Sequence, residues 1–183
     1  MSDFLQTVNH HSGQQLELCY HCHTCTAGCP VGGEMTYGPD RVIRLVELGE
    51  RDRVLKSMDI WLCASCETCA ARCPNDIDVA TMMDTLRHIA LAEAVRVPDG
   101  RITSFHQIFL TVVKTLGRSH EASLLAFYAP RNLALVAASV GSGLKMFLSG
   151  KLPLIPHRIK GAGNVKALYK AARQADTAEG LGR

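Results

Sequence analysis

The chain has 183 residues, of which 47% are hydrophobic and 20% charged, and these values exclude a wholly disordered protein. Its formal net charge is only +3, and its length allows one domain, or one domain with an appendage. The N-terminus lacks the basic and apolar segments of a secretory signal, so we expect a cytoplasmic location. No stretch reaches about 18 consecutive apolar residues, so we expect no transmembrane segment.

Eight cysteines form two runs with one spacing, C-x-x-C-x-x-C-x-x-x-C-P. The first run is Cys19, Cys22, Cys25 and Cys29 followed by Pro30, and the second is Cys63, Cys66, Cys69 and Cys73 followed by Pro74. Each cysteine of the second run lies 44 residues after its counterpart. Flanking residues such as Thr24 and Thr68 also match. The repeat indicates an internal duplication and predicts approximate two-fold symmetry.

This spacing is typical of ligands to 4Fe–4S clusters. Three thiolates at i, i+3 and i+6 can surround one cluster, and the proline after the fourth cysteine turns the chain away. In two-cluster ferredoxins the fourth cysteine of each run binds the other cluster. We therefore predict two 4Fe–4S clusters with crossed ligands. The metal ligands would be Cys19, Cys22, Cys25 and Cys73 for the first cluster, and Cys63, Cys66, Cys69 and Cys29 for the second.

Other uses of the cysteines are less favoured by the pattern. Zinc sites usually combine two separated C-x-x-C pairs, and disulfide frameworks belong mostly to secreted chains. His21 and His23 lie inside the first run, but all eight thiols are already allocated, so we expect both to be exposed loop residues rather than ligands. At the matching positions the second run has Ser65 and Glu67. This difference predicts unequal reduction potentials for the two clusters.

The regions outside the cysteine runs indicate helices. Between the runs, a helix should begin at Pro39–Asp40, with Asp40 and Glu47 on its polar side. Trp61 is expected either to shield a cluster or to pack in the core. After the second run, Asp78 should cap a helix that ends before a turn at residues 97–100. The apolar stripe of that helix consists of Val79, Met82, Met83, Leu86 and Ala90.

Beyond residue 100 the pattern predicts helices at about 104–116, 121–129, 131–148 and 164–174. No segment alternates with period two, so the expected fold class is mostly α. Residues 133–148 are apolar on most faces. A helix of this kind is covered by a partner or buried, and we favour docking onto another protein of a complex over packing in the chain's own core or on a membrane surface.

The cysteine segments at residues 19–30 and 61–74 resemble the C-type subunits of heterodisulfide reductase, as do the 44-residue repeat and the helix expected after the second run. Residues 150–160 are also similar to the C-terminal part of bacterial members of that family. The resemblance implies an α-helical ferredoxin core carrying two 4Fe–4S clusters. We place this core in residues 1–98 and a helical C-terminal extension for subunit docking in residues 99–183.

In function, the resemblance implies an electron relay between two other subunits of the complex. One is the A-type subunit, which contains flavin, and the other is the thiol/disulfide-active B-type subunit, which has CCG motifs. This sequence has no adjacent cysteine pair, GxGxxG motif or P-loop, so we expect no catalytic site of its own.

Two alternatives remain. One is an iron–sulfur relay subunit of another oxidoreductase, glycolate oxidase-like or succinate dehydrogenase-like, although 18 residues before Cys19 leave no room for the N-terminal 2Fe–2S domain of the latter. The more remote one is a zinc-stabilised nucleic-acid-binding module. It would use residues 145–183, which hold eight lysines or arginines against Asp176 and Glu179, whereas the favoured interpretation involves no nucleic acid.

Overall fold

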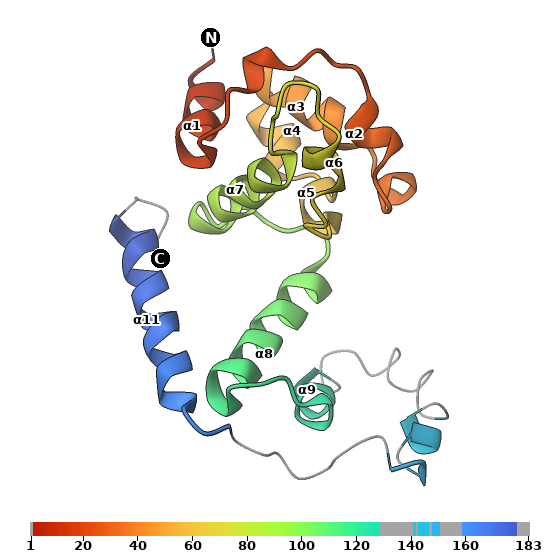
Figure 1. Ribbon diagram of the computed structural model, residues 1–183, viewed down its shortest axis with the longest axis vertical. Helices are drawn as coiled ribbons and strands as arrows, with labels where there is room; N and C mark the ends of the chain where they lie inside the picture. The colour runs from red at the N-terminus through yellow and green to blue at the C-terminus, as the bar shows by residue number, and fades with distance from the viewer. Residues whose placement is uncertain (1, 129–140, 142, 147, 151–158, 179–183) are drawn as a thin grey trace. The chain divides into compact units, whose positions relative to one another are not determined.

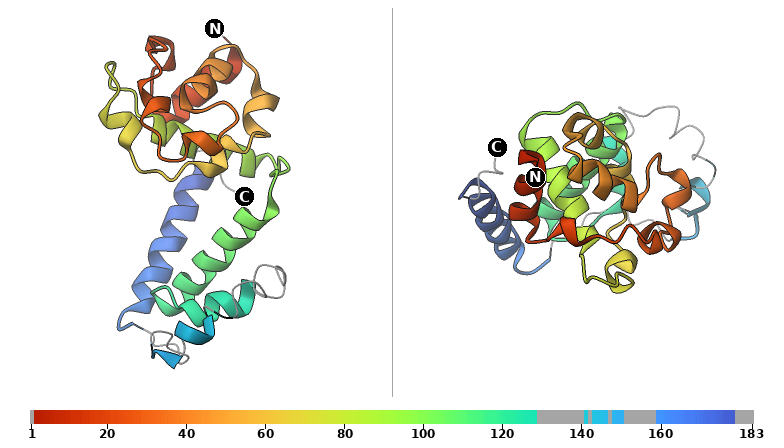
Figure 2. Two further views of the ribbon diagram at one scale, coloured as in Figure 1. Left: turned by 90° about the vertical axis from the view of Figure 1, so that its right-hand side faces the viewer. Right: turned by 90° about the horizontal axis from the view of Figure 1, so that it is seen from above.

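A computed structural model of the chain describes residues 2–128, 141, 143–146, 148–150 and 159–178. Helices and irregular segments account for all of this described part, in which no strand occurs, and the predicted mostly α fold is thereby confirmed (Figures 1 and 2). The chain divides into two compact units, residues 1–98 and residues 99–182. Within the described ranges, no helix combines the length and the apolar character needed to cross a membrane.

The first unit is built on α7, a 14-residue helix that contacts four others. Its apolar stripe, predicted from the sequence, is buried against α1, α4, α5 and α6, and Asp78 caps its N-terminus as expected. Removal of these aliphatic side chains from water is the main stabilising contribution. The helices of this unit are α1 (Asp3–Ser12), η1 (Leu16–Leu18), α2 (Thr24–Ala27), η2 (Gly32–Glu34), α3 (Pro39–Glu47), α4 (Arg51–Leu55), α5 (Asp59–Leu62), α6 (Thr68–Ala71) and α7 (Val79–Ala92).

Helix α3 begins at Pro39 as predicted, and its apolar residues Val42, Leu45 and Val46 are buried. The polar side of this helix is not fully exposed, because the side chain of Asp40 is buried. The helical period assigns Asp40 to the face opposite the core, but another part of the chain covers that face.

The second unit contains α8 (Gly100–Leu116), α9 (Glu121–Tyr128) and α11 (Ala162–Ala178), and α8 contacts both of the others. Helix α8 begins four residues earlier than predicted, because the Asp99 side chain accepts a hydrogen bond from the Arg101 backbone and caps it. The predicted turn at residues 97–100 therefore includes the start of this helix. Most of the predicted helix at 131–148 lies outside the described residues.

Candidate metal centres

The two cysteine runs fold into loops with matching backbone conformations. His21 and His23 have φ values of 51° and 61°, and their counterparts Ser65 and Glu67 have values of 49° and 56°. This left-handed conformation is unfavourable for residues other than glycine, at roughly 1–2 kcal/mol each. Its recurrence at matched positions, each time followed by a four-residue helix (α2 or α6), shows that the duplication extends to the backbone.

The chain also leaves both loops in the same way. The Cys29 amide donates to the Thr26 carbonyl and the Cys73 amide to the Ala70 carbonyl, both at 3.1 Å. Each cysteine carbonyl then accepts a bond from the amide three residues later, at 3.2 Å for Cys29 and 3.3 Å for Cys73. A proline follows each cysteine, so the last thiol of each run is held at a tight turn.

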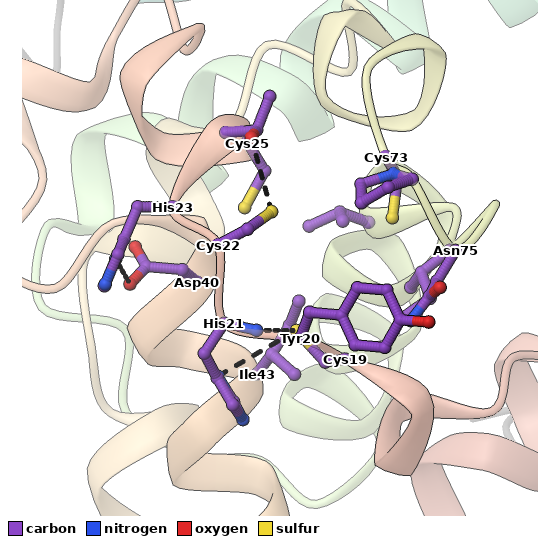
Figure 3. Close-up of a pocket in the computed structure, with 14 residues that line it drawn as sticks. Cys19, Tyr20, His21, Cys22, His23, Cys25, Asp40, Ile43, Cys73 and Asn75 are labelled. Carbon is purple, nitrogen blue, oxygen red and sulfur yellow. Dashed lines mark hydrogen bonds and ion pairs between the residues drawn. The ribbon is translucent and has the colours of Figure 1, made fainter.

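The eight cysteines line two pockets, four in each. The first pocket contains Cys19, Cys22 and Cys25 of the first run together with Cys73 of the second (Figure 3). The second pocket contains Cys63, Cys66 and Cys69 of the second run together with Cys29 of the first. Each encloses about 370 Å³ not occupied by atoms, part of it open to solvent. The structure thus brings the last cysteine of each run to the first three of the other.

Close packing of α2 against α6 makes this exchange possible. A side-chain carbon on Gly28, at the end of α2, would come within 2.7 Å of Arg72 Nη1, at the end of α6. The Arg72 side chain thus lies directly against the end of α2. Cys29 and Cys73, which directly follow these residues, can therefore reach across to the opposite pocket.

All eight cysteines are free thiols. Cys22 and Cys66, at matching positions, are exposed, and the pKa of each thiol is lowered because the hydroxyl of Thr24 or Thr68, at 3.3 and 3.4 Å from the sulfur, can donate a hydrogen bond to the thiolate. Burial, with a smaller contribution from the Asp40 carboxylate, raises the pKa of Cys25 to about 11. A coordinated metal deprotonates such a thiol outright, so a raised value does not oppose ligation.

Across the described residues, no group of three or more His, Cys, Asp or Glu side chains is arranged for a single metal ion. A zinc ion would draw its sulfur ligands to about 2.3 Å from one point. A 4Fe–4S cluster instead takes one thiolate at each of four iron atoms, so its ligands surround a larger group. Four thiols lining one pocket fit such a cluster in donor chemistry and in number.

Two carboxylates of α3 hold the first loop. Asp40 Oδ2 lies 2.6 Å from His23 Nδ1, and Glu47 Oε2 lies 3.0 Å from His21 Nε2. The Thr26 hydroxyl also donates to Asp40. Burial alone would raise the pKa of Asp40, but the hydrogen bonds from Thr26 and His23 outweigh it and hold the pKa below its ordinary value. Both histidines therefore position the loop through contacts with residues that are distant in the sequence.

The second loop is held by an arginine of α7. Arg87 Nη1 donates to the Cys63 carbonyl at 3.2 Å, and Nη2 donates to the Ser65 hydroxyl at 2.9 Å. Arg87 also forms an ion pair with Asp84, one turn earlier on the helix, at 3.3 Å. Nothing in the local sequence pattern indicated that Arg87 faces the cysteine loop.

Asp59 holds in place a backbone segment next to residues that line the second pocket. Its fully buried carboxylate accepts hydrogen bonds from the backbone amides of Thr36, Tyr37 and Gly38 at 2.7–2.9 Å. These amides fix the segment between Met35 and Pro39, both of which line the second pocket. Trp61, on the same helix as Asp59, is buried and lines neither pocket.

Residues 18–78 match a family model described as a 4Fe–4S dicluster domain. The helical fold and the two four-cysteine pockets agree with this match, so the chain is an iron–sulfur protein that contains a 4Fe–4S dicluster domain.

Within that class, the chain is homologous to the C-type subunits of heterodisulfide reductases, which confirms the predicted resemblance. It is 46% identical over 77 residues to the C-type iron–sulfur subunit 2 of CoB–CoM heterodisulfide reductase from Methanocaldococcus jannaschii, covering 42% of this chain and 41% of the relative. It is 36% identical over 104 residues to the C-type subunit of the ferredoxin/F(420)H(2)-dependent CoB–CoM heterodisulfide reductase from Methanosarcina acetivorans, covering 57% of this chain and 64% of that protein. The chain thus spans less than two thirds of the length of these relatives.

Proposed function

We propose that this protein is an electron-transfer subunit of a heterodisulfide reductase-like complex and relays electrons through two 4Fe–4S clusters. The observation that carries the proposal is the pair of pockets, each lined by three cysteines of one run and the last cysteine of the other. We assign Cys19, Cys22, Cys25 and Cys73 to the first cluster, and Cys63, Cys66, Cys69 and Cys29 to the second. A 4Fe–4S cluster supplies a site that gains and loses single electrons.

The protein's own contribution is to hold the two sites close together and to limit access of water. Val79, the first residue of α7, is buried and lines both pockets, so the two sites share this side chain as part of their walls. Ile43 and Ile77 form part of the apolar wall of the first pocket, and Met83 forms part of the wall of the second. Closely spaced sites within an apolar shell suit electron transfer from one cluster to the other.

We further propose that the relay connects a flavin-containing, A-type subunit to a B-type subunit with CCG motifs in the cytoplasm, with residues 99–183 docking these partners. The names of the relatives, each the C-type subunit of a reductase, support the assignment to a complex. The absence of adjacent cysteines from this sequence supports a role in relay rather than in disulfide cleavage.

Anaerobic purification of the full chain, with whatever co-elutes, tests the proposal. We expect a brown protein with about eight iron atoms per chain, together with a flavoprotein and a CCG-motif protein. A colourless zinc protein would contradict the iron–sulfur assignment. Eight irons with different partner subunits would support the relay but contradict the heterodisulfide reductase-like complex.

A further inference from the structure

The two halves of the duplicated region hold matching loop residues with side chains of opposite charge. In the first half, the loop residue with positive φ, His21, forms a hydrogen bond with the Glu47 carboxylate on α3. In the second half, its counterpart Ser65 accepts a hydrogen bond from the Arg87 guanidinium on α7. Accepting the proposed function, we infer that this exchange of charge gives the second cluster the higher reduction potential, so that the first electron rests on it.

The environment of the first pocket is negative. Asp40 lines the pocket and Glu47 lies two turns further along α3, with side chains only 5% and 12% exposed. Little solvent screens these two carboxylates. Glu47 also forms an ion pair with Arg44 at 3.0 Å, but the Arg44 side chain is 57% exposed, so water and salt screen its charge. A negative environment opposes the addition of an electron.

The environment of the second pocket is positive. The Arg87 side chain is only 12% exposed, and its Nε is buried without a hydrogen-bond partner within the described structure. Its guanidinium donates a hydrogen bond to the backbone carbonyl of Cys63, one of the proposed ligands of the second cluster. An arginine is always charged, and a buried charge of this kind favours the addition of an electron nearby.

The opposing charges near the second pocket are weaker. Asp84, the ion-pair partner of Arg87, is 55% exposed, and Glu67 is also exposed, so water and salt screen both. Arg72 lies against Gly28 of the first loop and lines neither pocket, so its charge does not favour one cluster over the other. The better-buried arginine therefore dominates. A one-electron donor, such as the proposed flavin protein, would deliver an electron to the first cluster. That electron would then pass to the second cluster, so the first is reoxidised and the second is reduced.

An EPR-monitored reductive titration of the anaerobically purified full chain tests this order. The wild-type protein should show two distinct midpoint reduction potentials, one for each cluster. Arg87→Gln should lower only the higher one, Arg87→Lys should largely retain it, and Glu47→Gln should raise only the lower one. Lys56→Gln removes an equal charge from an exposed residue of the same unit, paired with Asp52, and should leave both midpoints in place.

Two indistinguishable midpoint potentials in the wild type would overturn the inference. It would also be overturned if Arg87→Gln lowered the lower midpoint potential, or changed neither of the two. If Arg87→Gln does not assemble its clusters, the Glu47→Gln variant provides the test. A rise in the higher midpoint potential, or no change in either, would then contradict the inference. The iron content of the wild type keeps the two proposals apart. A chain without about eight irons contradicts the proposed function, whereas eight irons with the wrong order of midpoints contradicts only this inference.

Discussion

Cys73 lies in the same pocket as Cys19, although the two residues belong to different cysteine runs. Burial is the main cause of the raised pKa of Cys19, and the charge of Cys73 contributes to it, so the two thiols interact. The corresponding cysteine of the first run, Cys29, lies in the opposite pocket. Because each pocket needs residues from both halves of the repeat, cluster assembly and the folding of residues 1–98 should depend on one another.

Asp59 should be one of the most sensitive positions for stability. In Asp59→Ala the amides of Thr36, Tyr37 and Gly38 would lose a buried charged acceptor, at a cost of about 3 kcal/mol or more in the free energy of unfolding. Thermal unfolding of the cluster-loaded protein should show a midpoint lower by more than about 10 °C. Asp52→Ala, at an exposed carboxylate in the same unit, should have little effect, and equal losses in the two variants would contradict this account.

Asp78 should stabilise α7 in a pH-dependent way. Burial alone would raise the pKa of Asp78, but hydrogen bonds from the Thr81 hydroxyl and amide outweigh it and lower the pKa below 3.8. The stabilisation is therefore complete above the unfolded value of 3.8 and is lost as the pH falls through the folded value.

Asp78→Ala should cost about 1 kcal/mol at pH 7, measured by denaturant unfolding, and Asp78→Asn should cost less because asparagine also caps helices well. The difference between wild type and Asp78→Ala should be the same at pH 7 and pH 6. A difference that shrinks between these two values would contradict the assigned pKa direction.

Thr24 and Thr68 provide a matched pair of hydrogen bonds to sulfur. A cluster-bound thiolate cannot donate, so each hydroxyl would donate to its cysteine, Cys22 or Cys66. Hydrogen bonds to sulfur stabilise the more negative, reduced state. Thr24→Val should lower the midpoint of the first cluster only, and Thr68→Val that of the second only, in an EPR-monitored titration. Thr103→Val, in the second unit, is the control, and a shift of both midpoints by either variant would count against separate sites.

The sequence patterns were sufficient to predict the mostly α fold and the two groups of four cysteines that the structure brings together. Helix α7 could also be predicted, because its cap and its apolar stripe lie close together in the sequence. Helix α1 and the short helices α4 and α5 were not predicted, and α4 and α5, with five and four residues, hardly exceed one helical turn.

The residues that hold the two loops could not be found in this way. Asp40 could be placed on the polar side of its helix, but the loop contacts of Asp40, Arg87 and Asp59 could not be predicted, because they are made with residues 14 to 24 positions away. Hydrophobic periodicity reports which side of a helix faces the core. It does not report that the opposite side of α3 is covered by the first cysteine loop, so these positions require the tertiary structure.

The crossed arrangement of ligands is tested most directly by comparing Cys29→Ala with Cys73→Ala in iron content and EPR spectra. Each variant should retain about half of the iron. Cys29→Ala should lose mainly the EPR signal of the second cluster, which is the signal that shifts when Arg87 or Thr68 is replaced. Cys73→Ala should lose mainly the signal of the first cluster, which shifts when Glu47 or Thr24 is replaced. The opposite pairing, in which Cys29→Ala removes the centre held by Cys19, Cys22 and Cys25, would contradict the account.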